Sequence, residues 1–503
     1  MSDRVDVVVI GSGYGGSAVA ARVAPHGRTI VLERGRVWRP GDFPSHLPGL
    51  AGAYHTRRNP LGLWGMRLGE GTGNAYVSGV GGASLVNYGI TQAPEDHVFD
   101  DWPLSREALA PYYARALEVL RPAPSPLADA LGDKDFLDHV EPGRRVDLVN
   151  TIDWERCTHC GLCVPGCNVS AKRSLDVTYL AIAKSHGAEI RAEREVVAID
   201  PDGDGWRVVV RQTGRGRSDA DEVIPARHVV LAAGTFGTLD LLHRQRDRLS
   251  TTAWFGRAMT MNGDGLAFLY NTSHPLSGHH GAPITTSVHL PFIDPSGRER
   301  TLNVMSGRIP KVAMRFSALV LGLFGGALGR RRGPRDPATA RARRRLLDLL
   351  RTDPEGALAH TFMYKLDAED SSGGRAVFDA EGRSALAWPG YQDDPIVRFA
   401  AGRLEAWAAR VGGVLVPDVS GLPGMRSFGV HPLGGVRMGR GPEDGVVDPA
   451  GRLLRPDGGV YPGLRVADAS IIPSSLGVPS SLTVAALGER VGEDLANELR
   501  AAA

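Results

Sequence analysis

The first 33 residues carry the pattern that most constrains the fold. An apolar run over residues 6–10 is typical of a strand buried on both faces, and a glycine-rich turn follows it directly. A helix pattern of small residues and a second short strand, 29–32, come next, and this strand leads into Glu33. Strand, turn, helix and strand in this register predict a βαβ unit that binds a dinucleotide.

Each part of this unit has a physical role. Gly11 allows the tight turn, Gly13 lets the backbone approach a pyrophosphate, and Gly16 permits close packing of helix on strand. The helix N-terminus supplies free N–H groups for phosphates, and Glu33 stands where a carboxylate accepts ribose hydroxyls. The motif alone does not separate FAD from NAD. The predicted cradle comprises Gly11, Gly13, Tyr14, Gly15, Gly16, Glu33 and Arg34.

Composition excludes several classes of protein. A net charge of +2 over 503 residues is too balanced for a dedicated nucleic-acid binder. No secretory signal precedes the first strand, and no run of about 18 apolar residues predicts a spanning helix, so we expect a cytoplasmic protein. All four cysteines fall within residues 157–167, unlike the dispersed cysteines of a secreted disulfide scaffold.

Further blocks follow along the chain, at 79–89, 229–235, 431–435, 464–470 and 480–483. In this order they resemble the glucose–methanol–choline (GMC) oxidoreductases, most closely the cholesterol-oxidase-like branch. The resemblance implies that FAD accepts a hydride from an alcohol carbon while a protein base takes the hydroxyl proton. It also implies a small lipophilic alcohol (sterol, steroid or terpenoid-like) as substrate, with O2 or an external acceptor taking the electrons.

The implied fold is α/β, with a Rossmann-like FAD-binding domain interleaved with an α+β substrate domain that carries an antiparallel sheet. We expect the FAD-binding domain to take residues 1–100, 188–265 and 424–503. The substrate domain then takes residues 101–187 and 266–423, with the cysteine-rich segment 157–167 in its first piece. Short strands before Val196 and around residues 206–210 predict a β-meander.

The resemblance also assigns cofactor contacts outside the first 33 residues. The glycine-rich segment 79–89 resembles the stretch that lies along the flavin, Val196 the residue whose backbone meets adenine, and Asp468 the acid beside the ribityl chain. The helix starting near Ser481 would point its N-terminus at the isoalloxazine. The implied set is Gly79, Gly82, Ser84, Asn87, Gly89, Val196, Ala233, Gly234, Asp468 and Ala469.

His431 matches the family's catalytic histidine, and imidazole can orient or deprotonate a substrate hydroxyl. The family usually places a second His or Asn before the last helix, where this chain has Pro479, which has no polar side chain. Either Ser480 or Ser481 serves instead, or both only cap the helix, or His431 acts alone. A fourth interpretation is a non-oxidative flavoprotein, an isomerase or lyase. Residues 360–370 contain candidate bases, but no motif selects among them.

The cysteines form a run with ferredoxin-like spacing, Cys157, Cys160, Cys163 and Cys167. Some bacterial GMC dehydrogenases resemble this, with an iron–sulfur centre in a cysteine-rich insert. Three ligands would suit a [3Fe–4S] cluster and four a [4Fe–4S] cluster; a zinc site and thiols without metal stay open as alternatives. An electron-transfer subunit is a further interpretation, against which His431 argues.

Residues 318–328 form a short apolar run, followed by arginine triplets at 330–332 and 343–345. Eleven residues cannot span a bilayer. Two interpretations stay open for residues 318–345: a lid in peripheral contact with a membrane, or a loop of the substrate domain with a solvated basic helix.

Overall fold

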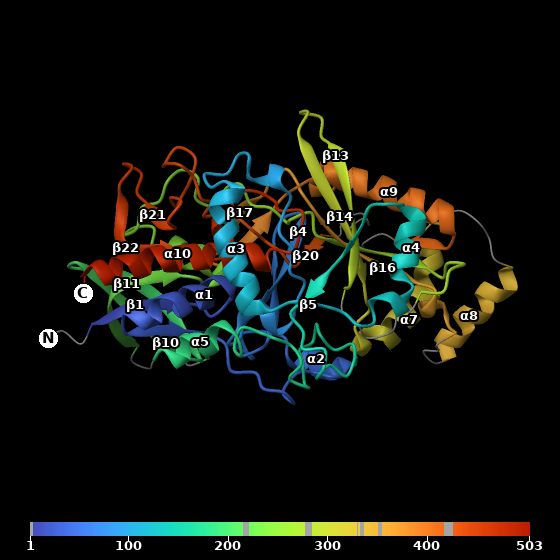
Figure 1. Ribbon diagram of the computed structural model, residues 1–503, viewed down its shortest axis with the longest axis horizontal. Helices are drawn as coiled ribbons and strands as arrows, with labels where there is room; N and C mark the ends of the chain where they lie inside the picture. Colours follow the sequence, from blue (N-terminus) through green and yellow to red (C-terminus); the bar gives the residue numbers. More distant parts are fainter. Residues whose placement is uncertain are drawn as a thin grey trace.

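The computed structural model describes residues 4–214, 221–276, 284–328, 330–331, 337–350, 355–416 and 426–502. Its strands build two large sheets, one at each end of an elongated molecule (Figure 1). Both chain termini lie at the end that holds the first sheet. This arrangement is the α/β fold with a second, antiparallel sheet that the sequence predicts.

The first sheet is mixed. Its core is parallel because β1 pairs with β2 on one side and β11 on the other, and β8 and β22 extend it in parallel. β9, β10 and β11 form the predicted antiparallel meander, and β21 closes the edge. The strands are β1 (Val5–Ile10), β2 (Thr29–Leu32), β8 (Glu189–Arg191), β9 (Arg194–Asp202), β10 (Gly205–Gln212), β11 (Glu222–Leu231), β21 (Arg452–Leu454) and β22 (Val460–Val466).

Helices pack beside this sheet around α10, the long carboxyl-terminal helix (Figure 1). Ser105 caps α3 by accepting a hydrogen bond from the backbone N–H of Ala108. The large hydrophobic core of the molecule lies between these helices and the parallel strands, of which β1 and β2 have almost every side chain buried. The helices are α1 (Tyr14–Val23), α3 (Arg106–Leu120), α5 (Tyr179–Ser185), α6 (Gly234–Arg244) and α10 (Ser481–Ala502).

The second sheet is antiparallel throughout and has its own hydrophobic core. Its order is β15 (Arg330–Arg331), β19 (Val414–Val416), β12 (Gly265–Tyr270), β16 (Phe362–Ala368), β14 (Glu299–Gly307), β13 (Thr286–Ile293) and β6 (Arg145–Asp147). The helices at this end are α4 (Asp133–Val140), α7 (Lys311–Leu328), α8 (Ala338–Leu350) and α9 (Pro395–Val411).

Smaller elements fill the middle of the molecule. β20 (Ser427–Gly429) pairs with β4 (Thr72–Val77), which pairs with β3 (Trp64–Leu68). Two short ladders, β17 (Arg375–Phe378) with β18 (Ser384–Ala387) and β5 (Ala123–Pro124) with β7 (Val149–Asn150), and α2 (Leu47–Gly52) complete the described elements.

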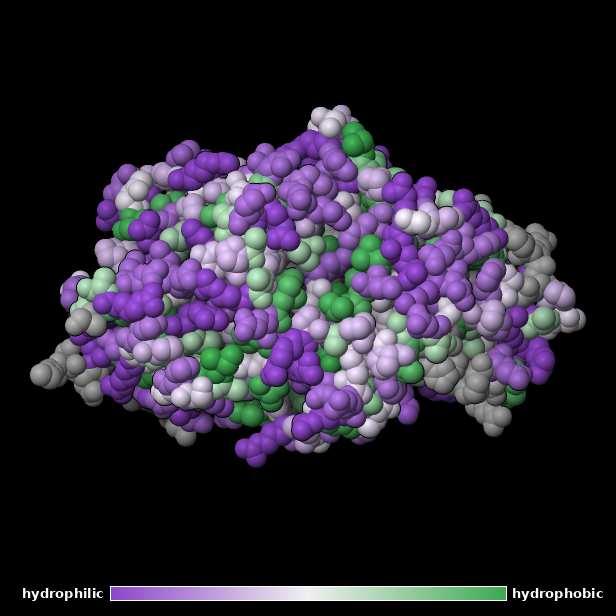
Figure 2. Space-filling view, viewed as in Figure 1, coloured by the Kyte–Doolittle hydropathy of each residue, from purple (hydrophilic) through white to green (hydrophobic). Residues whose placement is uncertain are grey.

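The two sheets draw their strands from interleaved parts of the chain. The domain boundaries themselves stay predictions, and the boundary between 423 and 424 lies outside the described residues. Residues 318–328 lie within helix α7, and α8 follows it. Within the described parts of the chain, helices of sufficient length lack the apolar character needed to cross a bilayer. Figure 2 shows a mainly hydrophilic face with small hydrophobic groups.

Glycine allows α1 and α10 to cross closely. A Cβ on Gly488 of α10 would stand 2.6 Å from the carbonyl oxygen of Gly15 in α1. A Cβ on Gly492, one turn later, would stand 3.0 Å from the Cα of Val19. The backbone of the glycine-rich turn is therefore held in place by the last helix, although the two are separated by almost the whole chain.

We expect Gly488→Ala to lower the free energy of unfolding by about 1–3 kcal/mol, because the added methyl group overpacks the crossing. The matched control is Gly402→Ala in α9, where no heavy atom lies within 4 Å of the added Cβ. This substitution should raise the stability by about 1 kcal/mol through helix propensity alone. Denaturant titrations of the three proteins measure both effects, and equal stability of the Gly488→Ala variant and the parent would contradict the crossing.

Candidate functional site

The turn between β1 and α1 leaves no room for side chains at three of its glycines. A Cβ on Gly11, whose φ is +107°, would stand 2.1 Å from the carbonyl oxygen of Ala232. A Cβ on Gly15 would stand 1.8 Å from the carbonyl oxygen of Ala467, and one on Gly16 would stand 2.2 Å from that of Gly11. These three glycines therefore pack the turn tightly against the ends of β11 and β22.

Gly13 differs from them, because no heavy atom lies within 4 Å of the position of its Cβ. It is the N-cap of α1, and no side chain caps the helix there. The helix begins at Tyr14 with free backbone N–H groups, and free N–H groups at a helix N-terminus bind phosphate. An open backbone between tight contacts fits a dinucleotide pyrophosphate.

Glu33 lies beside this turn, just past the end of β2. Its buried carboxylate accepts hydrogen bonds from the hydroxyl of Ser12 at 2.7 Å and from the backbone N–H groups of Ser12 and Gly35 at 3.2 and 2.8 Å. The side chain of Arg34 turns toward β4, where its Nε donates to the Ser78 hydroxyl at 3.3 Å and its guanidinium lies over the Tyr76 ring. The acid that the sequence predicts for ribose is therefore fixed next to the turn.

The second glycine-rich segment, 79–89, packs onto the first. A Cβ on Gly82 would stand 2.9 Å from the Cα of Gly13. Asn87 Nδ2 donates to the Tyr14 hydroxyl at 2.8 Å, and its Oδ1 accepts from the backbone N–H of Gly89 at 3.1 Å. Two blocks that the sequence assigns to one cofactor are thus in direct contact.

Other members of the predicted cofactor set also lie near this turn. The Ser84 hydroxyl donates to the carbonyl of Gly81, beside Gly79, and accepts from the backbone N–H of Leu175. Ala233 and Gly234 form the turn between β11 and α6, and Gly234 has open space around its Cβ position. Val196 lies on β9, opposite Val210 in the meander.

Asp468 follows the end of β22 and is buried. Its carboxylate accepts from the Ser470 backbone and hydroxyl at 2.9 and 2.5 Å, and from the Thr238 hydroxyl at 2.5 Å. Burial raises the pKa of Asp468, although these donors oppose the shift. The next residue, Ala469, accepts from the backbone N–H of Gly434 at 3.1 Å, which ties this acid to the segment that carries the candidate catalytic histidine.

His431 lies just after β20 and faces the second sheet. Its Nδ1 is 3.1 Å from Asp367 Oδ1 and 3.7 Å from Asp264 Oδ2. Asp264 Oδ2 also accepts from the backbone N–H groups of Val430 and His431. Burial by itself would lower the pKa of His431, but the carboxylates of Asp367 and Asp264 outweigh it and raise this pKa above the ordinary value.

Lys365 completes this cluster. Its ammonium contacts Asp264 Oδ1, and it donates to Asp367 Oδ1 at 2.9 Å and to the carbonyl of Leu366 at 2.8 Å. Ligating atoms of Asp264, Asp367 and His431 lie within 4.8 Å of one another. The single ammonium of Lys365 already pairs with both carboxylates, so the arrangement is that of an ion-pair network rather than of a cation site.

The stretch 360–370, in which no sequence motif selects a base, divides its acids among three partners. Asp367 meets His431, and Glu369 pairs with His97 at 2.9 Å. Asp370 accepts from the Thr260 hydroxyl and three backbone N–H groups, and burial raises its pKa to about 6.

Sequence reasoning missed Lys365 and Asp367. The available signal is their spacing of two in an otherwise apolar strand, which places both on one face.

The loop before α10 contains Pro479 and the two candidate serines. Asn262 Nδ2 donates to the carbonyl of Val478 at 2.8 Å, which fixes this loop. The carbonyl of Ser480 accepts from the backbone of Val484, and the Ser481 hydroxyl donates to the carbonyl of Ile90 at 3.2 Å. Within the described residues, no hydrogen bond joins either serine to His431, and the capping interpretation fits their positions better.

The four cysteines lie in a partly buried loop beside segment 79–89. Lys172 connects the two, because its ammonium donates to the carbonyl of Asn87 and, at 3.3 Å, to the carbonyl of Cys163. Burial raises the pKa of Cys163 to about 12. No three of the described cysteine sulfurs come within 4.8 Å of one another, whereas the ligands of one tetrahedral zinc ion would be about 3.8 Å apart.

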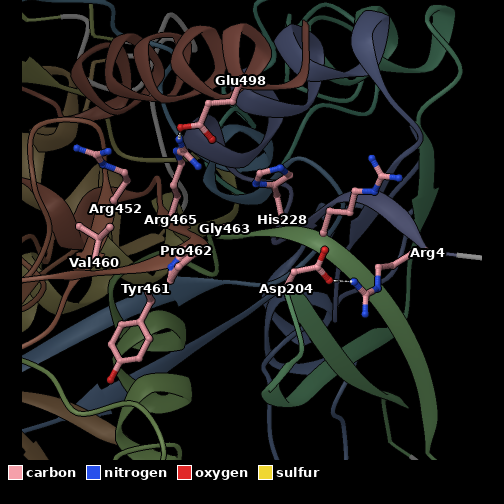
Figure 3. A pocket seen from close by; sticks show the side chains of 11 residues that line it. Arg4, Asp204, His228, Arg452, Val460, Tyr461, Pro462, Gly463, Arg465 and Glu498 are labelled. Atoms are coloured by element: carbon pink, nitrogen blue, oxygen red, sulfur yellow. Dashed lines mark hydrogen bonds and ion pairs between the residues drawn. The ribbon is translucent and has the colours of Figure 1, made fainter. Parts of the chain in front are cut away.

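A separate surface cavity of about 520 Å³ opens at the other end of the first sheet (Figure 3). None of the predicted site residues lines it. Its arginines are already paired with acids, Arg4 with Asp204 and Arg465 with Glu498 among them. The charges of the cavity are thus balanced within the protein.

Comparison with known proteins identifies the family. The amino-terminal model of the GMC oxidoreductases matches residues 15–245, and the carboxyl-terminal model matches residues 417–488. A cholesterol oxidase of Mycobacterium tuberculosis is 28% identical, with 97% of this chain and 91% of that protein aligned. A long-chain-alcohol oxidase of Arabidopsis thaliana is 24% identical, over 95% of this chain and 65% of that protein.

A solved structure agrees. The formate oxidase of Aspergillus oryzae, described for modification of its FAD, superimposes with a TM-score of 0.63 at 15% identity, over 99% of each chain. The family models cover more than half of the chain, and the glycine-rich turn leaves the open backbone at Gly13 that a dinucleotide pyrophosphate needs. The chain belongs to the GMC oxidoreductase family and is an FAD-dependent alcohol oxidoreductase.

Proposed function

We propose that this protein oxidises the CH–OH group of a lipophilic alcohol, of the sterol, steroid or terpenoid class, to a carbonyl. The observation that carries the proposal is His431, which the carboxylates of Asp264 and Asp367 hold and whose segment is joined through Gly434 to Ala469, next to the buried Asp468. The cholesterol and long-chain-alcohol oxidases among its relatives favour an apolar substrate over a sugar.

The proposed roles follow from this geometry. Bound FAD supplies the hydride acceptor. With FAD bound, the free N–H groups around Gly13 would hold the pyrophosphate, Glu33 would hold the ribose, and Asp468 would hold the ribityl chain. His431 accepts the hydroxyl proton at Nε2, since Nδ1 is already held, and the nearby carboxylates stabilise the imidazolium that forms. Electrons leave to O2 or to an external acceptor.

We also propose the domain division that the sequence predicts, with FAD held by residues 1–100, 188–265 and 424–503. The strands of the first sheet all come from these ranges. Residues 101–187 and 266–423 then form the substrate domain, which supplies β13, β14 and β16 opposite His431. In this division Asp367 and His431 belong to different domains.

A non-oxidative reaction is the second candidate, and Pro479 is the observation that favours it. Without the usual polar partner at that position, the histidine could serve proton transfer alone, as in an isomerase or lyase. The charged cluster around His431 favours oxidation, because it holds a base in a single orientation. Measuring flavin reduction separates the two reactions.

We expect an anaerobic panel of sterols and other lipophilic alcohols to bleach the flavin of the wild-type protein. His431→Gln should slow bleaching on the order of 10²-fold, because the general base is lost. The control is His186→Gln, at an exposed residue after α5, which should leave the rate unchanged. Stopped-flow absorbance measures all three. Full bleaching by His431→Gln at the wild-type rate would contradict the assigned role.

We propose that the cysteine run binds an iron–sulfur cluster that receives electrons from FAD. The spacing of Cys157, Cys160, Cys163 and Cys167 supports it, as does the short path through Lys172 to Asn87. Zinc is less well supported, because the sulfurs are too far apart for one ion. With a cluster, dehydrogenase behaviour is favoured over peroxide release.

Anaerobically purified or reconstituted protein should then contain about three or four iron atoms and as many sulfides per flavin. Cys160→Ser should lower this content while leaving FAD bound, because the cradle does not include the loop. Metal analysis and the visible absorption beyond the flavin bands provide the measurement. Iron well below one equivalent per flavin would favour free thiols.

We propose that α7 and α8 contact a membrane from which the substrate enters. Three large apolar side chains of α7 are more than half exposed, as are Leu346 and Leu350 of α8. Exposed arginines on α8, among them Arg343 at 72%, would meet lipid phosphates. The three α7 residues are Phe316, Leu323 and Phe324. Part of segment 318–345 lies outside the described residues.

Replacing Leu323 and Phe324 together by serine should reduce recovery on anionic vesicles about tenfold, because two exposed apolar side chains that would insert into the lipid are lost. Ile293→Ser is the control, since Ile293 is 61% exposed on β13, away from these helices. Vesicle flotation measures recovery. Equal flotation of both variants and the wild type would contradict the membrane contact and favour a solvated basic helix.

A further inference from the structure

We propose that Asp367 is the positioning residue for His431, and that it takes over the role of the polar partner missing at Pro479. This inference rests on the proposed oxidation of an alcohol. It assigns the orientation of the imidazole to β16 of the second sheet, rather than to the loop before α10.

The geometry of the imidazole carries the inference. Nδ1 lies 3.1 Å from Asp367 Oδ1, within hydrogen-bond distance, and the Asp367 side chain is fully buried. Nε2 makes no hydrogen bond within the described residues, and the histidine side chain remains 21% exposed. Asp367 therefore fixes the tautomer with hydrogen on Nδ1 and leaves the lone pair of Nε2 free to accept a proton.

A second acid fixes the backbone of the same residue. Asp264 Oδ2 accepts from the backbone N–H groups of Val430 and His431, so the main chain as well as the ring is held. Asp264 precedes β12 and Asp367 lies on β16, so neighbouring strands of one sheet supply both acids. Near Pro479, the Ser481 hydroxyl donates to the carbonyl of Ile90, and the carbonyl of Ser480 accepts from the backbone N–H of Val484 at the start of α10.

Among the described residues, three charged groups act on His431 and further titratable groups lie close to them. They are Asp264, Asp367 and Lys365 from the second sheet, with Asp370 and the buried Tyr391 close to the acids. Lys365 pairs with both acids, and its positive charge lowers the proton affinity of His431. Lys365 and His431 both contact Oδ1 of Asp367, while Oδ2 is buried without a hydrogen-bond partner among the described residues.

The proton and electrons balance in the step that this arrangement serves. The alcohol O–H bond breaks and its proton goes to Nε2 of His431. The C–H bond breaks with its electron pair leaving as hydride to the oxidised FAD, and the carbonyl double bond forms. Because His431 gains a positive charge, the negative charge of Asp367 stabilises the product of the proton transfer.

Two variants test the inference through opposite pH shifts. The base must be neutral, so kcat/KM rises with pH through the pKa of His431. Asp367→Asn removes a negative neighbour and should move this rise to lower pH, with kcat reduced on the order of 10²-fold and KM little changed. Lys365→Met removes the positive neighbour and should move the rise to higher pH.

The matched control is Asp240→Asn. Asp240 is also a buried acid in an ion pair, with Arg67 at 2.8 Å, but it does not contact His431. We expect Asp240→Asn to lower the free energy of unfolding without moving the pH profile of kcat/KM. An unchanged profile in Asp367→Asn, or equal shifts in the variant and the control, would overturn the inference.

A readout independent of turnover uses holoenzyme labelled with 15N-histidine, with the His431 signals assigned by difference from His431→Gln. The wild type should show hydrogen on Nδ1 and a bare Nε2 at high pH, and Asp367→Asn should alter that tautomer. If no alcohol bleaches the wild-type flavin, the proposed function fails, while the tautomer still decides the role of Asp367. A wild-type tautomer with hydrogen on Nε2 would overturn the role of Asp367.

Discussion

Close packing of backbone on backbone at the first turn is the constraint on which the rest of the site depends. Gly11, Gly15 and Gly16 bring the turn against the carbonyl groups at the ends of β11 and β22, and Gly488 brings the last helix onto the same turn. A side chain at any of these positions would collide with main-chain atoms. The ends of three parallel strands and two helices are thereby gathered around one open backbone position, Gly13.

The second level of organisation is electrostatic and joins the two sheets. His431 follows a strand of the small central sheet, while the acids that hold it come from the antiparallel sheet. Buried charges are costly unless paired. Lys365 pairs with both acids, which allows the cluster to persist inside the protein. Protonation of His431 changes the net charge of this cluster by one. If Asp367 orients the ring as we propose, His431 needs no polar side chain at Pro479.

The sequence predicts the fold well because its signals are local. β2 and the start of α10 fall at the predicted residues, and Ser105 caps α3, since each depends on nearby glycine, serine or apolar spacing. Contacts between distant segments are harder to predict. Nothing near Asp367 in the chain indicates that it meets His431, 64 positions later, or that Asn262 fixes the Pro479 loop. Residues 360–370 show the limit of prediction from sequence. The sequence contains the acids, but only the sheet register assigns each acid to its partner.

The central claim is that the reaction is oxidation, with hydride leaving the carbinol carbon. The most direct measurement is anaerobic flavin bleaching by a substrate alcohol carrying deuterium on that carbon, compared with the unlabelled alcohol. The account predicts slower bleaching by the deuterated alcohol and one carbonyl product per flavin bleached. Conversion of the alcohol without flavin bleaching would contradict oxidation. So would equal bleaching rates for the two alcohols when the chemical step limits bleaching.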